Sequence, residues 1–445
     1  MSKAGRTEAL HERPPGRRSR SRWWAAAVAL AVAAVAGLVV ASPWQSPAPA
    51  YLTATPKTPI RWASLTHVFP AFHQAGTTTA DQADVGGVAC TAPTFCMAVA
   101  GAGIAEIFDG KSWHRSQPPS LLSGGYRVEG YRVACTQRQF CVVTTMWGNA
   151  VAYDQGRWSK VTSVTGAHPW TTTCSPGSPA VNCGGYTTTL VSWIACARPT
   201  LCIAVGNGPA PGIRQQTFVF NGSAWAPGPA LPSGFTVSTP GATEPASVSC
   251  PSTGACFAAG YLSEVCRTPT ANCTPRTFDP RATSSAGSTA EVLPGTAVFD
   301  GHSWSRPTVI SPAADKSLLP VTISCSSATT CLAAIGNSGG NARFVALGAG
   351  HWSPVPAAPL PEGTSPTRPT MTPAWVACGS PVFCVDAGDV AGGSLLLYNG
   401  RRMLRWGNAE GAGGQVGPVS CPSATFCVGF DANGDALTYR AGPPG

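Results

Sequence analysis

Short apolar stretches separated by polar turns recur along most of the chain, and one pattern of positions returns seven times. In every copy, two cysteines with five residues between them are flanked by apolar positions. Two residues before the first cysteine stands Val88, Val133, Ile194, Val248, Ile323, Val376 or Val419, and directly after the second stands Met97, Val142, Ile203, Phe257, Leu332, Val385 or Val428. β-Branched and apolar residues on both sides of a short polar turn predict a β-hairpin.

The cysteines are predicted to form disulfides within each hairpin. Directly opposed positions of antiparallel strands bring Cβ atoms within about 5 Å of each other, so each repeated pair is expected to close on itself. The repeated pairs are Cys90 with Cys96, Cys135 with Cys141, Cys196 with Cys202, Cys250 with Cys256, Cys325 with Cys331, Cys378 with Cys384 and Cys421 with Cys427. The other four of the 18 cysteines form two further predicted pairs, Cys174 with Cys183 and Cys266 with Cys273. An even number of cysteines is typical of a disulfide framework outside the cytoplasm.

Two further strands are predicted after each hairpin. The third strand ends in an aromatic residue before a tight turn, often Asp-Gly or Asn-Gly, at Phe108, Tyr153, Phe220, Phe299 and Tyr398. The fourth strand opens on a tryptophan at Trp113, Trp158, Trp225, Trp304 and Trp352, and the sixth copy has Met403 at this position. Each unit is therefore expected to contain four antiparallel strands.

Seven such units predict an all-β fold, a seven-bladed β-propeller that protects its sheet edges by closing into a ring. The seventh copy ends at Tyr439, which leaves too few residues for a fourth strand. Residues 60–65 resemble the fourth strand around Trp158. We therefore predict that this N-terminal segment completes the last blade and that the propeller spans residues 60–445.

The segment before the propeller resembles a membrane anchor. Residues 23–41 contain no charge, and a helix of this length is about 28 Å long, close to the hydrocarbon thickness of a bilayer. The basic tail 1–22 would stay in the cytoplasm, which makes this a single-pass protein of the cell membrane with an extracytoplasmic C-terminal domain. A cleaved signal peptide and a secreted protein are the alternative, because Val39 and Ala41 satisfy the small-residue rule. The proline-rich residues 42–59 predict an extended linker.

Composition and the distribution of charge indicate which kinds of partner this protein is expected to have. The chain has 50 glycines and 42 prolines but only 11% charged residues, which is typical of strands and turns and not of a charged, disordered tail. More than half of the net charge of +9 lies in residues 1–22. No basic stripe interleaved with aromatic residues follows, so a nucleic-acid partner is not predicted.

The repeats resemble a known group. Val-Ser-Cys-Pro-Ser-Ala-Thr-Phe-Cys-Val at 419–428 and Phe-Asp-Gly-His-Ser-Trp at 299–304 are similar to the cysteine-paired propeller repeats of actinobacterial secreted and membrane-anchored proteins. The turn and tryptophan also resemble the Asp-box of sialidase-type propellers, although the spacing is one residue shorter and the leading Ser/Thr is irregular. The resemblance covers about residues 60–445 and implies a fold, because propellers support binding platforms as well as enzymes.

The irregular segments are expected on one face of the ring. Successive strands of a blade reverse direction, so the loops between second and third strands and the connections between blades emerge together; we call this side the loop face. Its longest segments are 163–190, 207–216, 261–295, 307–320 and 355–373. Aromatic and arginine residues are enriched at binding hot spots. The predicted ligand-binding residues of this face are Trp170, Tyr261, Arg267, Arg214 and Arg276.

Signals for catalysis or metal binding are weak. No motif supplies the paired carboxylates of a glycosidase or the arginine cluster and tyrosine of a sialidase. Asp431, Asn433 and Asp435 have the spacing of a calcium loop, but the twelfth position is Gly442, and Asn-Gly-Asp is also an ordinary turn. The histidines show no paired ligand spacing, so no metal and no cofactor are predicted. Asp386 replaces the Ala or Val of five other units, and it either lines the channel or bonds to a neighbouring blade.

These observations favour a membrane-tethered, extracytoplasmic binding platform that recognises a protein, a peptide or an envelope glycan. The alternative is a carbohydrate-active propeller enzyme of the sialidase-like glycosidase kind.

Overall fold

A computed structural model divides the chain into two units, Met1–Ala50 and Tyr51–Gly445. The structure describes residues 62–70, 85–119, 131–136, 139–146, 148–164, 190–207, 217–236, 247–252, 254–264, 291–311, 321–336, 343–356, 375–388, 394–408 and 416–441. Within these ranges no helix has the length and apolar character needed to cross a bilayer. The predicted tail, apolar segment and linker before residue 60 lie outside them.

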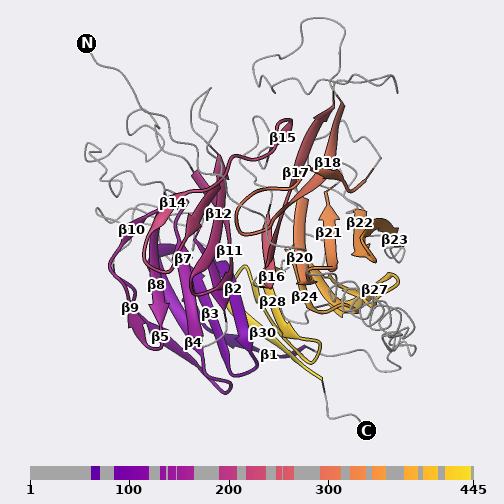
Figure 1. Cartoon of the computed structure of the whole chain (residues 1–445). Helices are drawn as coiled ribbons and strands as arrows, with labels where there is room; N and C mark the ends of the chain where they lie inside the picture. The colour runs from indigo at the N-terminus through magenta and orange to yellow at the C-terminus, as the bar shows by residue number, and fades with distance from the viewer. Residues whose placement is uncertain are drawn as a thin grey trace, which may run out of the picture. The chain divides into compact units, whose positions relative to one another are not determined.

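Seven antiparallel sheets make up the second unit (Figure 1). Blades one to three contain β2 (Val85–Ala92), β3 (Phe95–Ala100), β4 (Ile104–Phe108) and β5 (Trp113–Ser116); β6 (Arg132–Thr136), β7 (Phe140–Thr144), β8 (Asn149–Asp154), β9 (Arg157–Trp158) and β10 (Thr162–Ser163); and β11 (Leu190–Arg198), β12 (Leu201–Asn207), β13 (Thr217–Phe220) and β14 (Trp225–Pro227). Blades four and five contain β15 (Phe235–Thr236), β16 (Val248–Ser252), β17 (Ala255–Glu264), β18 (Glu291–Phe299) and β19 (Thr308–Val309); and β20 (Val321–Ser327), β21 (Thr330–Ile335), β22 (Arg343–Gly348) and β23 (His351–Val355). Blades six and seven contain β24 (Trp375–Ser380), β25 (Phe383–Ala387), β26 (Ser394–Tyr398) and β27 (Met403–Asn408); and β28 (Val416–Ser423), β29 (Phe426–Asp431), β30 (Asp435–Arg440) and β1 (Ala63–His67).

The sheets close into a ring through their first strands. β2 contacts β6, and the series continues through β11, β16, β20, β24 and β28, which contacts β2 again. The first strand of every blade is therefore the innermost one. The predicted seven-bladed β-propeller is confirmed.

The N-terminal strand completes the last blade, as predicted. β1 pairs antiparallel with β30, so the first described strand lies beside the last one (Figure 1). The ring of Trp62 packs against Tyr439 with 6.2 Å between their centroids. Beyond the strand, the backbone N–H groups of Val68 and Phe69 both donate to the Gly434 carbonyl oxygen. Residues about 370 positions apart in the chain are thus joined by sheet pairing, ring packing and turn hydrogen bonds.

All seven repeated disulfides are present, and each closes within its own hairpin as predicted. Their Cα–Cα distances lie between 3.9 and 4.2 Å. They join Cys90 to Cys96, Cys135 to Cys141, Cys196 to Cys202, Cys250 to Cys256, Cys325 to Cys331, Cys378 to Cys384 and Cys421 to Cys427. In five blades the two cysteines are paired directly across the first two strands. The predicted pairs Cys174 with Cys183 and Cys266 with Cys273 lie outside the described residues.

Apolar side chains pack mainly between blades, because each sheet turns one face to the blade before it and the other to the blade after it. One core cluster joins Phe257 and Ala259 of blade four to Ile323 and Ala333 of blade five. Another joins Phe108 of blade one to the last blade. The ring thus has no single core but a series of apolar seams.

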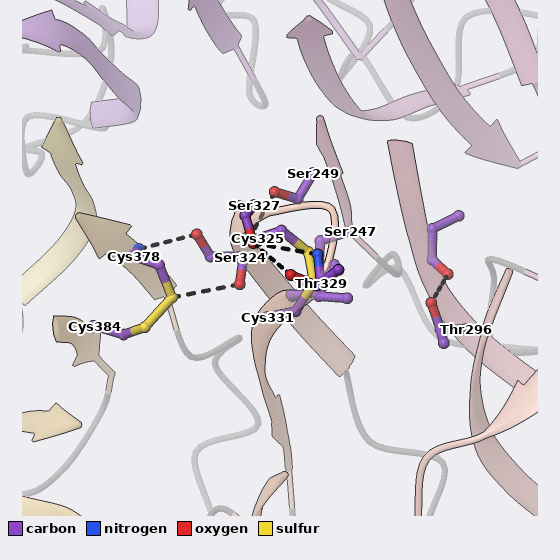
Figure 2. The surroundings of a disulfide bond; sticks show 12 residues. Ser247, Ser249, Thr296, Ser324, Cys325, Ser327, Thr329, Cys331, Cys378 and Cys384 are labelled. Atoms are coloured by element: carbon purple, nitrogen blue, oxygen red, sulfur yellow. Dashed lines mark hydrogen bonds between the residues drawn. A yellow bond between two sulfur atoms is a disulfide. The ribbon is translucent and has the colours of Figure 1, made fainter. Parts of the chain in front are cut away.

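Serine residues add hydrogen bonds across three of these seams. The Ser324 Oγ accepts a hydrogen bond from the Cys378 N–H of the next blade at 3.0 Å, and Ser249 does the same for Cys325 (Figure 2). Ser420 accepts from Cys90 at 2.9 Å and so links the last blade to the first. The Cys378 Sγ also lies 3.4 Å from the Ser324 carbonyl oxygen; a disulfide sulfur carries no hydrogen, so this is a close contact.

Two blades depart from the predicted four-strand pattern. The fourth strand of blade two is split, because β9 and β10 both pair with β8. In blade four, β17 and β18 remain paired from Cys256↔Phe299 to Glu264↔Glu291, and β15 pairs with the end of β17 that extends past β16. The prediction that residues 261–295 form a loop was therefore wrong at both ends, because backbone pairing continues through 261–264 and 291–295.

Candidate functional site

One predicted ligand-binding residue lies in the described part of the chain. Tyr261 belongs to β17, is 3% exposed and packs in the apolar seam between blades four and five with Ile310 and Val321. The structure thus places its ring in the core rather than on a loop. The other predicted residues, Trp170, Arg214, Arg267 and Arg276, lie outside the described residues.

A different set of side chains meets at the axis of the ring. Three residues before the first repeated cysteine, the innermost strands carry Gly87, Arg132, Trp193, Ser247, Thr322, Trp375 and Pro418. Four of the seven are small or compact and uncharged, whereas the second, third and sixth blades have large side chains. Ser247 at this position faces the next blade, because its Oγ accepts a hydrogen bond from the Ile323 N–H at 2.6 Å. Larger side chains at the same position are long enough to reach past the seam toward the axis.

Two of these large side chains pack against each other in a tilted arrangement. The ring centroids of Trp193 and Trp375 are 5.0 Å apart with an interplanar angle of 34°, although the residues belong to blades three and six. The Arg132 Cζ of blade two lies 5.3 Å from the Trp193 ring centroid and 5.4 Å from that of Trp375. Three blades therefore contribute to one contact. We call Arg132, Trp193 and Trp375 the axial cluster.

The backbone orients the guanidinium group of the cluster. Arg132 Nη1 donates to the Gly86 carbonyl oxygen at 2.9 Å and to the Tyr131 carbonyl oxygen at 3.1 Å. Blades one and two approach closely here, since a Cβ atom on Gly86 would collide with the Tyr131 carbonyl oxygen. A guanidinium group over an aromatic face contributes about 0.5–2 kcal/mol, depending on its desolvation. The Arg132 guanidinium group is thus held by backbone carbonyl oxygens and by the faces of two indole rings.

The axial cluster lies toward the loop face. Arg132 and Trp375 are the first residues of β6 and β24, where the chain enters from the preceding blade. Connections between blades emerge on the loop face, so the cluster lies at the loop-face end of the innermost strands. All three side chains are half-buried. Half-buried cationic and aromatic side chains therefore lie together at the end of the innermost strands where sequence analysis expected the ligand.

Asp386 of β25 is a buried carboxylic acid. It is 2% exposed, and its Oδ1 has no hydrogen-bond partner in the structure as described. Burial raises the pKa of Asp386 to about 7. The sequence suggested that Asp386 either lines the channel or bonds to a neighbouring blade. The residue is buried, and its Oδ1 forms no hydrogen bond to the described residues of a neighbouring blade, so neither interpretation accounts for this oxygen.

The residues with calcium-loop spacing form a turn. Asp431 Oδ1 accepts hydrogen bonds from the backbone N–H groups of Asn433 and Asp435, both at 2.9 Å. The Asp435 Oδ1 is 2.7 Å from His67 Nδ1 on the closing strand. Across the described residues, no three His, Cys, Asp or Glu side chains gather as metal ligands. Both carboxylates are already engaged by protein groups.

Asp109 and Asp300 cap the turns between third and fourth strands. Asp109 Oδ1 accepts from the backbone N–H groups of Lys111 and Ser112, each at 2.8 Å. These hydrogen bonds hold the pKa of the Asp109 carboxyl well below its usual range, and equivalent bonds lower the pKa of Asp300. Their role is the one that the Asp-Gly signal predicted, a tight turn rather than a catalytic acid.

Sequence analysis did not identify the axial cluster. The sequence nevertheless contains a pattern that could have revealed it. At the position three residues before the first cysteine, two of the seven repeats have tryptophan and one has arginine, whereas the others have Gly, Ser, Thr or Pro. The repeat was recognised instead from the apolar residue one position later, whose side chain packs between blades.

Comparison with known proteins concerns the fold. No family model matches the chain, and no curated protein matches it. A solved structure described as YCF48 bound to D1 peptide is 12% identical, with a TM-score of 0.45, and the match covers 85% of this chain and 99% of that one. YCF48 from Cyanidioschyzon merolae is 14% identical, also with a TM-score of 0.45, over 83% of this chain and 98% of that one.

Proposed function

We propose that this protein is a membrane-tethered, extracytoplasmic binding platform for a protein, a peptide or an envelope glycan. The observation that carries the proposal is the axial cluster, in which Arg132, Trp193 and Trp375 lie together half-buried. Tryptophan and arginine are the residue types most enriched among those that dominate binding energy. Placed on rigid innermost strands, they cost little ordering entropy when a ligand binds.

The strand positions of the cluster favour a ligand that approaches from the loop face. The connections 163–190 and 355–373 lead directly to the strands of Trp193 and Trp375 in the sequence. Loops carried by a rigid scaffold commonly supply the specificity of such sites. We therefore propose that Trp170, Arg214, Arg267 and Arg276 add contacts around a ligand seated on the cluster.

The proposed location rests on sequence and on the disulfides. The uncharged segment 23–41 after a basic tail is typical of an anchor with the C-terminal domain outside the cytoplasm. Seven disulfides in the propeller support an oxidising compartment. Carbonate extraction of membranes and N-terminal sequencing test the anchor: retention in the pellet with an intact N-terminus supports it, and a soluble protein that begins at Ser42 contradicts it.

The enzyme alternative requires carboxylates near the reacting bond. The seven innermost strands contain no Asp or Glu. The described wall of the channel therefore offers no carboxylate pair, and the binding platform is the function that the geometry supports better.

The test is retention of envelope material by the immobilised full-length chain. Membrane proteins, secreted peptides and cell-wall glycan are offered as separate fractions. We expect the double variant with Trp193→Ala and Trp375→Ala to lose at least about tenfold in affinity, equivalent to about 1.4 kcal/mol, for whichever fraction the parent retains. The matched control carries Trp304→Ala and Trp352→Ala on the outer parts of blades four and five. Equal retention by the cluster variant and the parent would exclude the cluster as the binding site.

A further inference from the structure

Asp386 lies in the seam between blades five and six. Side chains two residues apart on a strand point to the same face, so Asp386 shares its face with Cys384. Cys384 packs in an apolar cluster with Leu332, Ala334 and Phe344 of blade five. The carboxyl group therefore points from blade six toward apolar side chains of blade five.

None of the side chains described in this seam offers the carboxyl group a counter-charge. Arg405 of β27 is paired with Leu396, which is itself paired with Asp386, so it lies two strands from Asp386 on the same face of blade six. Thr322 and Ser324 lie on the face of β20, the innermost strand of blade five, that is turned toward blade six. The hydrogen bond between Ser324 and Cys378 shows this orientation (Figure 2). Thr322 is 2% exposed, and its Oγ1, like Asp386 Oδ1, has no partner in this part of the chain. On β26, Leu396 and Tyr398 belong to the same apolar cluster as Cys384, and the phenol of Tyr398 is the titratable group among the described members of that cluster. From β21, β22 and β24 the facing residues are uncharged.

Strand pairing connects this carboxyl group to the axial cluster. Asp386 is paired with Val376, and its neighbour Ala387 is paired with Trp375. The strand that carries the Trp375 ring is thus hydrogen-bonded to the strand that carries the buried acid. β24 also contacts β20 of blade five, so the strand that carries Trp375 borders the seam that holds the carboxyl group.

We propose that Asp386 is a proton-controlled switch of the axial cluster. With its carboxyl group protonated, the apolar seam stays closed and the two indole rings stay in contact. When the proton leaves for solvent, the carboxylate has no partner for Oδ1 among the described residues of the seam, and a buried unpaired charge is strongly unfavourable. Water then enters or blades five and six separate locally, and Trp375 shifts relative to Trp193. This inference concerns the regulation of the site proposed above, and it rests on that function only for its biological use.

The test needs no ligand, so its failure is distinct from failure of the binding proposal. The full-length chain is labelled with 5-fluorotryptophan, and the fluorine resonances of residues 193 and 375 are assigned from Trp193→Phe and Trp375→Phe. A titration from about pH 5 to about pH 9 spans the ionisation of Asp386. We expect both resonances to shift with a midpoint near pH 7 in the parent protein. In Asp386→Asn both are expected to stay at the position that the parent shows at low pH.

Controls separate a switch from a folding defect. Asp386→Ala introduces the residue that four other blades have at this position, so it gives a second uncharged variant if the asparagine variant misfolds. Asp431→Asn removes another buried carboxyl group, one that accepts two backbone hydrogen bonds, and it should keep the titration of the parent. Flat resonances in the parent, or an unchanged titration in a folded uncharged variant, would overturn the proposal.

Discussion

The indole rings of Trp193 and Trp375 are in tilted contact near the axis of the propeller, with 5.0 Å between their centroids, although 182 positions separate the residues in the chain. The contact joins blades three and six, which are not neighbours in the ring. It therefore couples opposite sides of the propeller in addition to the seams between adjacent blades.

This ring contact predicts energetic coupling between the two tryptophans. Aromatic pairs contribute about 0.5–1.5 kcal/mol beyond the area that they bury. A double-mutant cycle with Trp193→Ala and Trp375→Ala, measured by denaturant unfolding of the full-length chain, should give a coupling free energy in that range. Effects that add within about 0.3 kcal/mol would show that the rings do not interact in solution.

Gly86 is predicted to be intolerant of a side chain. In Gly86→Ala the new Cβ would meet the Tyr131 carbonyl oxygen, which belongs to backbone and cannot rotate away. We expect the free energy of unfolding to fall by about 1–3 kcal/mol and the Arg132 hydrogen bonds to be disturbed. Gly254→Ala is the matched control, because nothing lies within 4 Å of a Cβ there. Equal stability of the two variants would contradict the close approach of blades one and two.

Asp386 predicts a pH dependence of stability. Its pKa is about 7 in the folded protein, above the value of about 3.9 expected when unfolded, so the folded state holds the proton more tightly. The resulting stability is fully present below about pH 4 and is lost as the pH rises to about 7, up to about 4 kcal/mol in total. Denaturant unfolding at several pH values should show this decline in the parent protein. Asp386→Asn should show a smaller decline, and an identical one would exclude Asp386 as its source.

The closing strand is predicted to protect the last blade. Deleting residues 60–69 removes β1 and leaves β30 as an unpaired edge, and exposed edges pair with other chains. The variant should melt at lower temperature and aggregate, as measured by calorimetry and size-exclusion chromatography. Deletion of ten residues from the linker 42–59 controls for chain length. Normal melting and a single monodisperse species after the 60–69 deletion would contradict the pairing.

All nine disulfides are expected to be local. Seven are present in the structure, and the pairs Cys174 with Cys183 and Cys266 with Cys273 remain predictions. Peptide mapping without reduction should recover nine peptides or peptide pairs that match these assignments. A disulfide between a cysteine of the pair Cys174 and Cys183 and a cysteine of the pair Cys266 and Cys273 would contradict the prediction that each pair closes locally.

Local interactions explain why much of the fold was predictable. Each repeated disulfide joins residues six positions apart, and each third strand meets its fourth across a tight turn, as in Phe108↔Trp113. Such contacts form within one unit, so seven copies of the pattern sufficed to predict the strands and the blades. The missing fourth strand of the last unit further required a donor elsewhere in the chain, and β1 supplies it.

The sequence by itself determined the repeat, the strand order within blades, the seven local disulfides and the closing strand, because each depends on neighbouring residues or on the count of strands. Only the tertiary structure decided that Arg132, Trp193 and Trp375 meet at the axis, that Tyr261 is buried and that Asp386 Oδ1 faces an apolar seam without a described partner. These facts depend on which side of a strand faces the channel, a neighbouring blade or solvent. That orientation follows from closure of the ring, which brings together side chains from blades far apart in the chain.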